Sequence, residues 1–132
     1  MRKKILIVDD DPEMVELLRF NFKQAGYSIG TASNGAEALK KARSIAPDLI
    51  VLDLMMPELD GFSVCEILRR DKSTASIPII MLTALASQFA HLTSLESGAT
   101  DYMTKPFSPK AVISRAQHLL ESPAAAADSF PA

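Results

Sequence analysis

The sequence has one cysteine, no tryptophan and only 6% aromatic residues. Because Cys65 has no second cysteine to pair with, an intramolecular disulfide is excluded, and we expect a reducing, cytoplasmic setting. The basic start, residues 1–4, leads into only a short apolar run. We therefore expect neither a secretory signal nor a membrane span, and no membrane partner.

The chain also lacks a large excess of charge of either sign. Its 14 basic and 16 acidic residues give a net charge of -2, which offers no attraction for nucleic acid and no polybasic patch. We therefore expect no direct nucleic-acid binding by this domain. The length of 132 residues, with 48% hydrophobic and 23% charged residues, predicts one folded domain.

Apolar runs and cap residues predict strands that alternate with helices. Residues 5–8, 49–52 and 77–82 are typical of parallel strands covered on both faces, and weaker strands fit residues 27–32 and 101–104. Helices are predicted over residues 12–25, 35–46, 61–70, 87–97 and 109–120, four of them opened by the caps Asp11, Asn34, Asp60 and Ser108.

Five strands alternating with five helices specify a doubly wound α/β domain over residues 1–121, with right-handed crossovers. Residues 122–132 lack periodicity and are predicted to be a disordered tail or a truncated linker. Arg69 and Arg70 are predicted to form a solvated helix end.

The side chains suited to chemistry lie where the predicted strands end. Asp9 and Asp10 follow the first strand, and Asp53, Thr83 and Lys105 follow three others. Ligands of open α/β sheets bind beyond the carboxyl ends of the strands, so these side chains are expected to share one crevice. Carboxylates gathered there repel each other unless a cation neutralises them, and their oxygens suit Mg²⁺. A carboxylate can also attack a phosphoryl group, with the hydroxyl and the ammonium group stabilising the phosphoryl oxygens.

Two other classes of protein also have a functional site directly after a strand of an α/β fold. An enzyme of the haloacid dehalogenase type needs a second aspartate two positions after the nucleophile, where this chain has Met55. A flavodoxin-like nucleotide binder needs a Ser/Thr/Gly-rich loop after the first strand, where residues 9–11 are aspartates that would repel a phosphate. A phosphorylation-independent interaction scaffold on the same fold stays open as the alternative.

Four blocks, taken together, resemble the motifs of the receiver domain of bacterial two-component response regulators. They are Val-Asp-Asp at 8–10, Leu-Asp-Leu-Met-Met-Pro at 52–57 with Asp-Gly at 60–61, Met-Leu-Thr-Ala at 81–84 and Lys-Pro-Phe at 105–107. The resemblance covers residues 3–120, in the order and spacing of the family. It implies a flavodoxin-like (βα)5 domain with a parallel sheet in the strand order 2-1-3-4-5.

By the same resemblance, Asp53 is the phospho-acceptor, Thr83 the switch hydroxyl and Lys105 the lysine that contacts the phosphate. These three residues are the expected catalytic group for the domain's own phosphorylation. Tyr102 occupies the position of the family's switch aromatic residue. The bond before Pro106 is expected to be cis, which is plausible because it precedes a proline.

The resemblance also implies a magnesium site. Asp9 and Asp10 serve the metal, with Asp10 and Asp53 binding it directly together with the backbone carbonyl of Met55. Met55 and Leu85 border the path of a water molecule toward the phosphoryl group in receivers. Because neither side chain hydrogen-bonds strongly and both are bulky, we expect slow hydrolysis of the aspartyl phosphate.

The implied partners are a sensor histidine kinase or phosphotransfer protein, which presents phosphohistidine, and a downstream protein or covalently linked output domain. The kinase interface is expected at Met14 and Leu17 and at Pro106 and Phe107. The domain is expected to promote its own aspartyl phosphorylation and dephosphorylation, and not to be an enzyme acting on a separate metabolite.

A homodimer through the fourth and fifth helices is a further alternative. In the winged-helix transcription-factor branch of the family, that face is joined by ion pairs. Asp101 and Arg115 match one pair, whereas His91 with Ala111 and Glu96 with Gln117 break two others. Within the fourth helix, the apolar positions Leu85, Phe89, Leu92 and Leu95 have a spacing suited to burial, so some of them are expected to face the core.

Overall fold

The apolar runs form the strands of a five-stranded sheet, and helices connect them. The computed structural model describes residues 2–84 and 88–121. The elements, in chain order, are β1 (Lys4–Val8), α1 (Pro12–Gln24), β2 (Ser28–Ala32), α2 (Gly35–Ile45), β3 (Leu49–Asp53), α3 (Gly61–Arg70), β4 (Ile79–Thr83), α4 (Gln88–Ser97), β5 (Asp101–Thr104) and α5 (Pro109–Glu121).

All four strand pairings are parallel, and the sheet has the order β2-β1-β3-β4-β5. The predicted α/β fold and its strand order are therefore confirmed. Because the strands run in the same direction, their carboxyl ends lie along one edge of the sheet. Among the described residues, no helix is long and apolar enough to cross a membrane.

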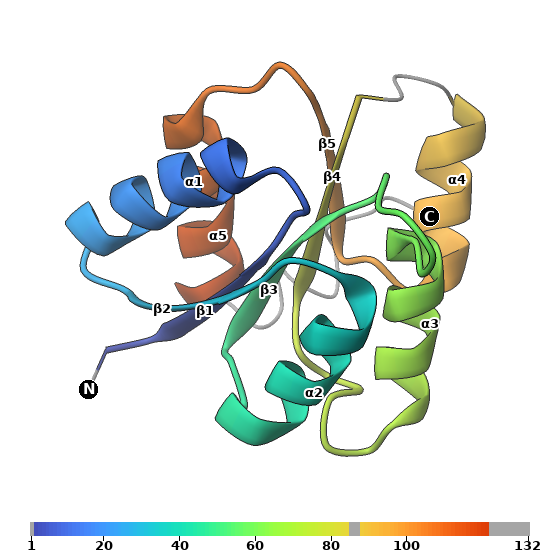
Figure 1. The fold of residues 1–132 in the computed structure, drawn as a ribbon. Coiled ribbons are helices and arrows are strands. Elements are labelled where there is room, and N and C mark those ends of the chain that lie inside the picture. Colours follow the sequence, from blue (N-terminus) through green and yellow to red (C-terminus); the bar gives the residue numbers. More distant parts are fainter. Residues whose placement is uncertain (1, 85–87, 122–132) are drawn as a thin grey trace.

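The sheet is covered on both faces, with α1 and α5 on one side and α2, α3 and α4 on the other (Figure 1). Alternate residues of β1 serve the two resulting cores. Leu6 and Val8 pack in the core that includes residues of α2 and α3, whereas Ile5 and Ile7 pack in the core that includes residues of α1 and α5. All four side chains are almost fully buried, which explains the uninterrupted apolar run.

Cap residues set the beginnings of the first three helices. The side chains of Asp11, Asn34 and Asp60 accept hydrogen bonds from backbone N–H groups in the first turns of α1, α2 and α3. Each cap directly follows a strand or a loop at the carboxyl edge of the sheet. The caps thus determine where the chain turns back over the sheet beside the clustered acids.

Two predicted strands begin too early. β4 begins at Ile79 and not at residue 77, and Pro78 in between has no N–H to donate to a neighbouring strand. The Pro78 carbonyl still accepts a hydrogen bond from Ile50 N–H at 2.9 Å. β2 begins at Ser28, because the N–H of Tyr27 donates to the Phe22 carbonyl at the end of α1. The predicted tail, residues 122–132, lies outside the described residues.

The prediction that Arg69 is solvated is wrong. Its side chain is half-buried, and its guanidinium donates to the carbonyls of Gly98, Ala75 and Ile77 at 2.7–3.0 Å. Arg69 therefore ties the end of α3 to the loops that flank β4 and α4. Arg70 is exposed, as predicted.

Candidate functional site

The register of the sheet brings the two buried aspartates side by side. Val8 of β1 pairs with Leu52 of β3, so Asp9 and Asp53, the next residues, leave the sheet as neighbours. Asp9 and Asp53 are 2% and 3% exposed, whereas Asp10 is exposed. One carboxylate oxygen from each of the three lies within 4.8 Å of the others. The structure thus brings together the three acids expected to share a crevice.

Lys105 bridges the two buried acids. Its ammonium group donates to Asp9 Oδ2 and to Asp53 Oδ1, both at 3.3 Å. The backbone N–H of Lys105 donates to the carbonyl of Thr83, which binds the loop after β5 to the end of β4. The peptide bond between Lys105 and Pro106 is cis.

The electrostatic environment of Asp53 disfavours its charged form. Burial, together with the negative charge of Asp9, raises the pKa of Asp53 from 3.8 to about 6, although Lys105 and the backbone N–H of Met55 act in the opposite direction. Burial opposes the charged form of Lys105, but the two aspartates outweigh it and raise the pKa of this lysine. The site therefore holds a fixed positive charge beside an acid that still ionises at neutral pH.

Thr83 and Tyr102 lie on neighbouring strands next to this cluster. Thr83 ends β4 and is fully buried, and it pairs with Thr104 of β5. Tyr102 lies two residues earlier on β5, opposite Met81, and its ring is half-buried against the core under α2 and α3. The two proposed switch residues are therefore connected through the paired ends of β4 and β5.

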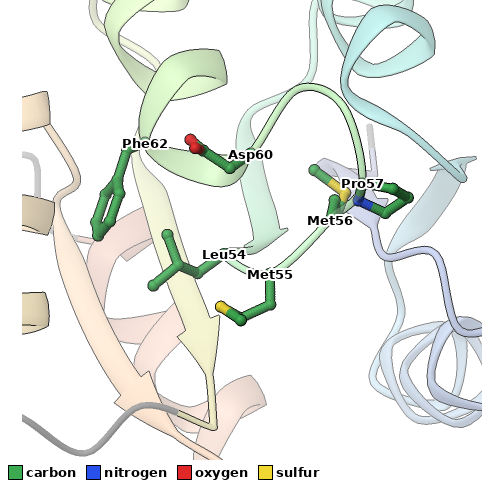
Figure 2. Close-up of a pocket in the computed structure, with 6 residues that line it drawn as sticks. All are labelled: Leu54, Met55, Met56, Pro57, Asp60 and Phe62. Carbon is green, nitrogen blue, oxygen red and sulfur yellow. The ribbon is translucent and has the colours of Figure 1, made fainter.

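A pocket of about 450 Å³ opens next to the end of β3, between the loop after β3 and α3. Its lining is Leu54, Met55, Met56, Pro57, Asp60 and Phe62 (Figure 2). The Met55 side chain extends away from the loop, apart from Met56 and Pro57 (Figure 2), and is 57% exposed. Leu85, the second residue expected to border the water path, lies outside the described residues.

The residues expected at a kinase interface lie on α1 and in the loop between β5 and α5. Leu17 on α1 is 44% exposed and Pro106 is exposed, whereas Met14 and Phe107 are partly buried against the core under α1 and α5. Sequence reasoning missed Phe20, which lies three residues after Leu17 on α1 and is 58% exposed. The helical spacing of these two apolar residues was the signal that could have revealed it.

Leu92 is one of the apolar positions predicted for the fourth helix, some of which were expected to face the core. Its side chain is 57% exposed. The buried positions of α4 include Ala90, Ser94 and Ser97 instead. The hydroxyl of Ser94 donates to the carbonyl of Ala90 and that of Ser97 to the carbonyl of Ser94, both at 2.9 Å, so both serines can be buried. Small side chains allow α4 to lie close to its neighbours, which apolar periodicity alone did not reveal.

Asp101 and Arg115, the two residues that match one ion pair of the family's dimer face, are in contact within this single chain. Arg115 Nε on α5 lies 2.6 Å from Asp101 Oδ2 on β5. This contact joins β5 and α5 within the domain.

Comparisons with known proteins show the family of this chain. The family model described as "Response regulator receiver domain" matches residues 5–117. The alkaline phosphatase synthesis transcriptional regulatory protein PhoP of Bacillus subtilis is 52% identical over 129 residues, which cover 98% of this chain and 53% of that protein. The DNA-binding dual master transcriptional regulator RpaA of Synechocystis is 46% identical over 117 residues, covering 89% of this chain and 48% of RpaA.

A solved structure shows the same fold. The chemotaxis protein CheY4 of Vibrio cholerae superposes with a TM-score of 0.87 at 32% identity, covering 91% of this chain and 100% of CheY4. The chain spans about half the length of the curated relatives PhoP and RpaA. The family match, the strand order and the cluster of acids at the strand ends lead to one conclusion: this chain belongs to the receiver domain family of two-component response regulators.

Proposed function

We propose that this domain is a phosphorylation-dependent signalling switch. It accepts a phosphoryl group on Asp53 and changes the face formed by its last two helices, α4 and α5, to control a downstream partner. The observation that carries the proposal is the position of Asp53, which is buried next to Asp9 and bridged to it by Lys105. Such a carboxylate has a metal-binding acid on one side and a fixed positive charge on the other. This is the combination of positioning and electrostatic stabilisation that phosphoryl transfer requires.

In the proposed reaction, a carboxylate oxygen of Asp53 attacks the phosphorus of a phosphohistidine. A new P–O bond forms, the P–N bond breaks, and the imidazole leaves with the electron pair of that bond. Lys105 turns from the carboxylates to the phosphoryl oxygens, and the buried hydroxyl of Thr83 donates a hydrogen bond to one of them. Hydrolysis later restores the carboxylate and releases phosphate, so the domain modifies only itself and is no enzyme for a separate metabolite.

The donor set fits Mg²⁺. Three carboxylates meet with one lysine, so their negative charge exceeds the positive charge of the lysine. Hard oxygen ligands in this number are the kind that Mg²⁺ uses when it keeps waters and a phosphate oxygen in its shell. Asp10, Asp53 and the Met55 carbonyl would hold the ion, with Asp9 supporting it. The ion would neutralise the phosphoryl oxygens and lower the repulsion between them and the acids.

The proposed partners follow from the same chemistry. A histidine kinase or phosphotransfer protein in the cytoplasm supplies the phosphoryl group through the face near Leu17 and Pro106. The curated relatives are named as transcriptional regulators, so we propose that an output domain or separate protein carries the response. The net charge of -2 supports a role in which this domain itself does not contact nucleic acid.

The proposal is tested by measuring the intact mass of the protein after incubation with acetyl phosphate, with Mg²⁺ or with a chelator. One phosphoryl group per chain is expected with Mg²⁺ only, and hydroxylamine should remove it because it cleaves acyl phosphates. Absence of any adduct with Mg²⁺ would favour the interaction scaffold over the switch.

A first prediction concerns the metal. Mg²⁺ at about tenfold excess over its dissociation constant should raise the melting temperature by roughly 5 °C, because it binds the folded state. Asp10→Asn should reduce this rise, and it should stabilise the metal-free protein by removing one of the mutually repelling charges. Asp11→Asn is the matched control, since asparagine caps a helix as well as aspartate does. Equal Mg²⁺ responses in Asp10→Asn and Asp11→Asn would contradict the assigned metal site.

A second prediction concerns the lifetime of the phosphorylated state. Met55→Asn should shorten it by roughly threefold to tenfold, because an amide beside the acceptor can orient the attacking water. Leu85→Glu is expected to act in the same direction. The decay of purified, phosphorylated protein at fixed Mg²⁺ gives the measurement. Leu92→Asn is the control, since Leu92 is as exposed as Met55 but lies on α4. Lifetimes equal to that of the wild type in both test variants would show that these side chains do not control water access.

A further inference from the structure

An aromatic contact joins α4 to the strand that carries the proposed switch tyrosine. The imidazole of His91 on α4 lies flat against the ring of Tyr102 on β5, with ring centroids 5.1 Å apart and an angle of 6° between the ring planes. His91 itself is exposed, whereas Tyr102 is half-buried. The histidine therefore covers the tyrosine ring from the outer side.

The backbone of Tyr102 is held independently of this stack. Its N–H donates to Asp101 Oδ1 at 2.8 Å, and β5 pairs with β4 along its length. Three residues after Tyr102, the N–H of Lys105 donates to the carbonyl of Thr83. The strand is thus bound to the phosphoryl site, and the side chain of Tyr102 is the part that can rotate without breaking the sheet.

Three buried positions of α4, Ala90, Ser94 and Ser97, have small side chains. The stacked ring of His91 is a contact of a different kind, since it links α4 directly to one rotamer of Tyr102. Aromatic pairs of this geometry shift a conformational equilibrium by about twofold to tenfold.

We propose that His91 is a positioning residue for Tyr102. Its ring stabilises the tyrosine orientation that accompanies the direct pairing of Lys105 with Asp53 and Asp9. Rotation of the Tyr102 side chain must break the stack with His91. His91 therefore raises the concentration of phosphoryl mimic at which half of the protein has switched. This inference rests on the proposed function and adds to it a residue that biases the switch from outside the phosphoryl site.

The two tyrosines make a direct test possible, because fluorotyrosine labelling gives one fluorine NMR signal for Tyr27 and one for Tyr102. Tyr27→Phe assigns the signals. His91→Ala removes the ring and keeps a residue that favours helix, His91→Phe keeps a planar ring, and His118→Ala is the control at the chain's other histidine. Each variant is titrated with beryllofluoride, a phosphoryl mimic, in the presence of Mg²⁺.

His91→Ala should shift the Tyr102 signal before the mimic is added and lower the concentration for half-saturation by about twofold to tenfold. His91→Phe should restore both values toward those of the wild type, which a role only in helix stability would not predict. A mimic response in the wild type, with the Tyr102 signal and half-saturation both unchanged in His91→Ala, would overturn the inference. No mimic response in the wild type would instead overturn the proposed function, and with it the bias on the switch.

Discussion

Asp53→Ala is expected to abolish phosphorylation by acetyl phosphate in the presence of Mg²⁺. Asp9 and Asp53 are both buried and both accept from Lys105. Of the three clustered acids, Asp53 is the one that is itself the last residue of a strand and that accepts from the backbone N–H of Met55, at 3.4 Å. Alanine has no oxygen to attack phosphorus, so the loss should be complete. Intact-mass measurement, followed by peptide mapping of the wild-type protein, gives the result.

Asp60→Asn is the matched control for this experiment. Asp60 lies seven positions after Asp53 and caps α3 by accepting from Ser63 N–H at 2.8 Å, a role that asparagine fills equally well. This variant should be phosphorylated as the wild type is. Equal labelling of Asp53→Ala and the wild type would show that another side chain accepts the phosphoryl group.

Asp53→Asn is expected to stabilise the metal-free protein at neutral pH. The pKa of Asp53 is about 6 in the folded protein and 3.8 is its ordinary value. As the pH rises, Asp53 therefore ionises in the unfolded chain before it ionises in the folded protein. Because the unfolded chain binds fewer protons between these two pKa values, the free energy of unfolding falls as the pH rises through this range. The penalty is small below pH 3.8 and complete above about 6, where it is about 3 kcal/mol.

Denaturant unfolding of both proteins with a chelator at pH 4 and pH 7 measures this effect. The gain in Asp53→Asn should be about 3 kcal/mol at pH 7 and small at pH 4. Asp71→Asn provides a control of opposite sign, because hydrogen bonds from Arg43 and Ser73 lower the pKa of Asp71 to about 2. That variant should lose stability at pH 7 and lose less as the pH falls toward 2. A gain in Asp53→Asn that is the same at both pH values would contradict the electrostatic origin.

The sequence predicted the position of the site because parallel strands bring their carboxyl ends to one edge. Asp9, Asp53 and Thr83 could be placed there from three apolar runs alone. The direct contact of Lys105 with two acids could not be predicted in this way. It depends on the backbone turn after β5 and on the distance that the lysine side chain must reach. Residue periodicity contains no information about either quantity.

The misplaced residues share a physical cause. Arg69 looked like a solvated residue because its charge favours water, yet three carbonyls at the ends of neighbouring elements satisfy its donors. Leu92 looked like a core residue, yet α4 turns a face that includes serines inward. In both cases a tertiary hydrogen bond, or a bond from a hydroxyl to its own helix, makes burial of a polar side chain favourable. The bonds of Arg69 depend on how the loops beside β4 and α4 pack against α3. Those of Ser94 and Ser97 are local to α4, and tertiary packing decides which face of that helix turns inward.

The proposed switch changes the face formed by the last two helices, α4 and α5, when Asp53 carries a phosphoryl group. Backbone amide NMR spectra of the wild type and Asp53→Asn, recorded with Mg²⁺ before and after addition of acetyl phosphate, test it most directly. We predict shifts in the wild type at Tyr102 and along α4 and α5 as well as at the site, and none of these in Asp53→Asn. Shifts confined to the site residues Asp9, Asp53 and Thr83, or equal shifts in both proteins, would contradict the claim.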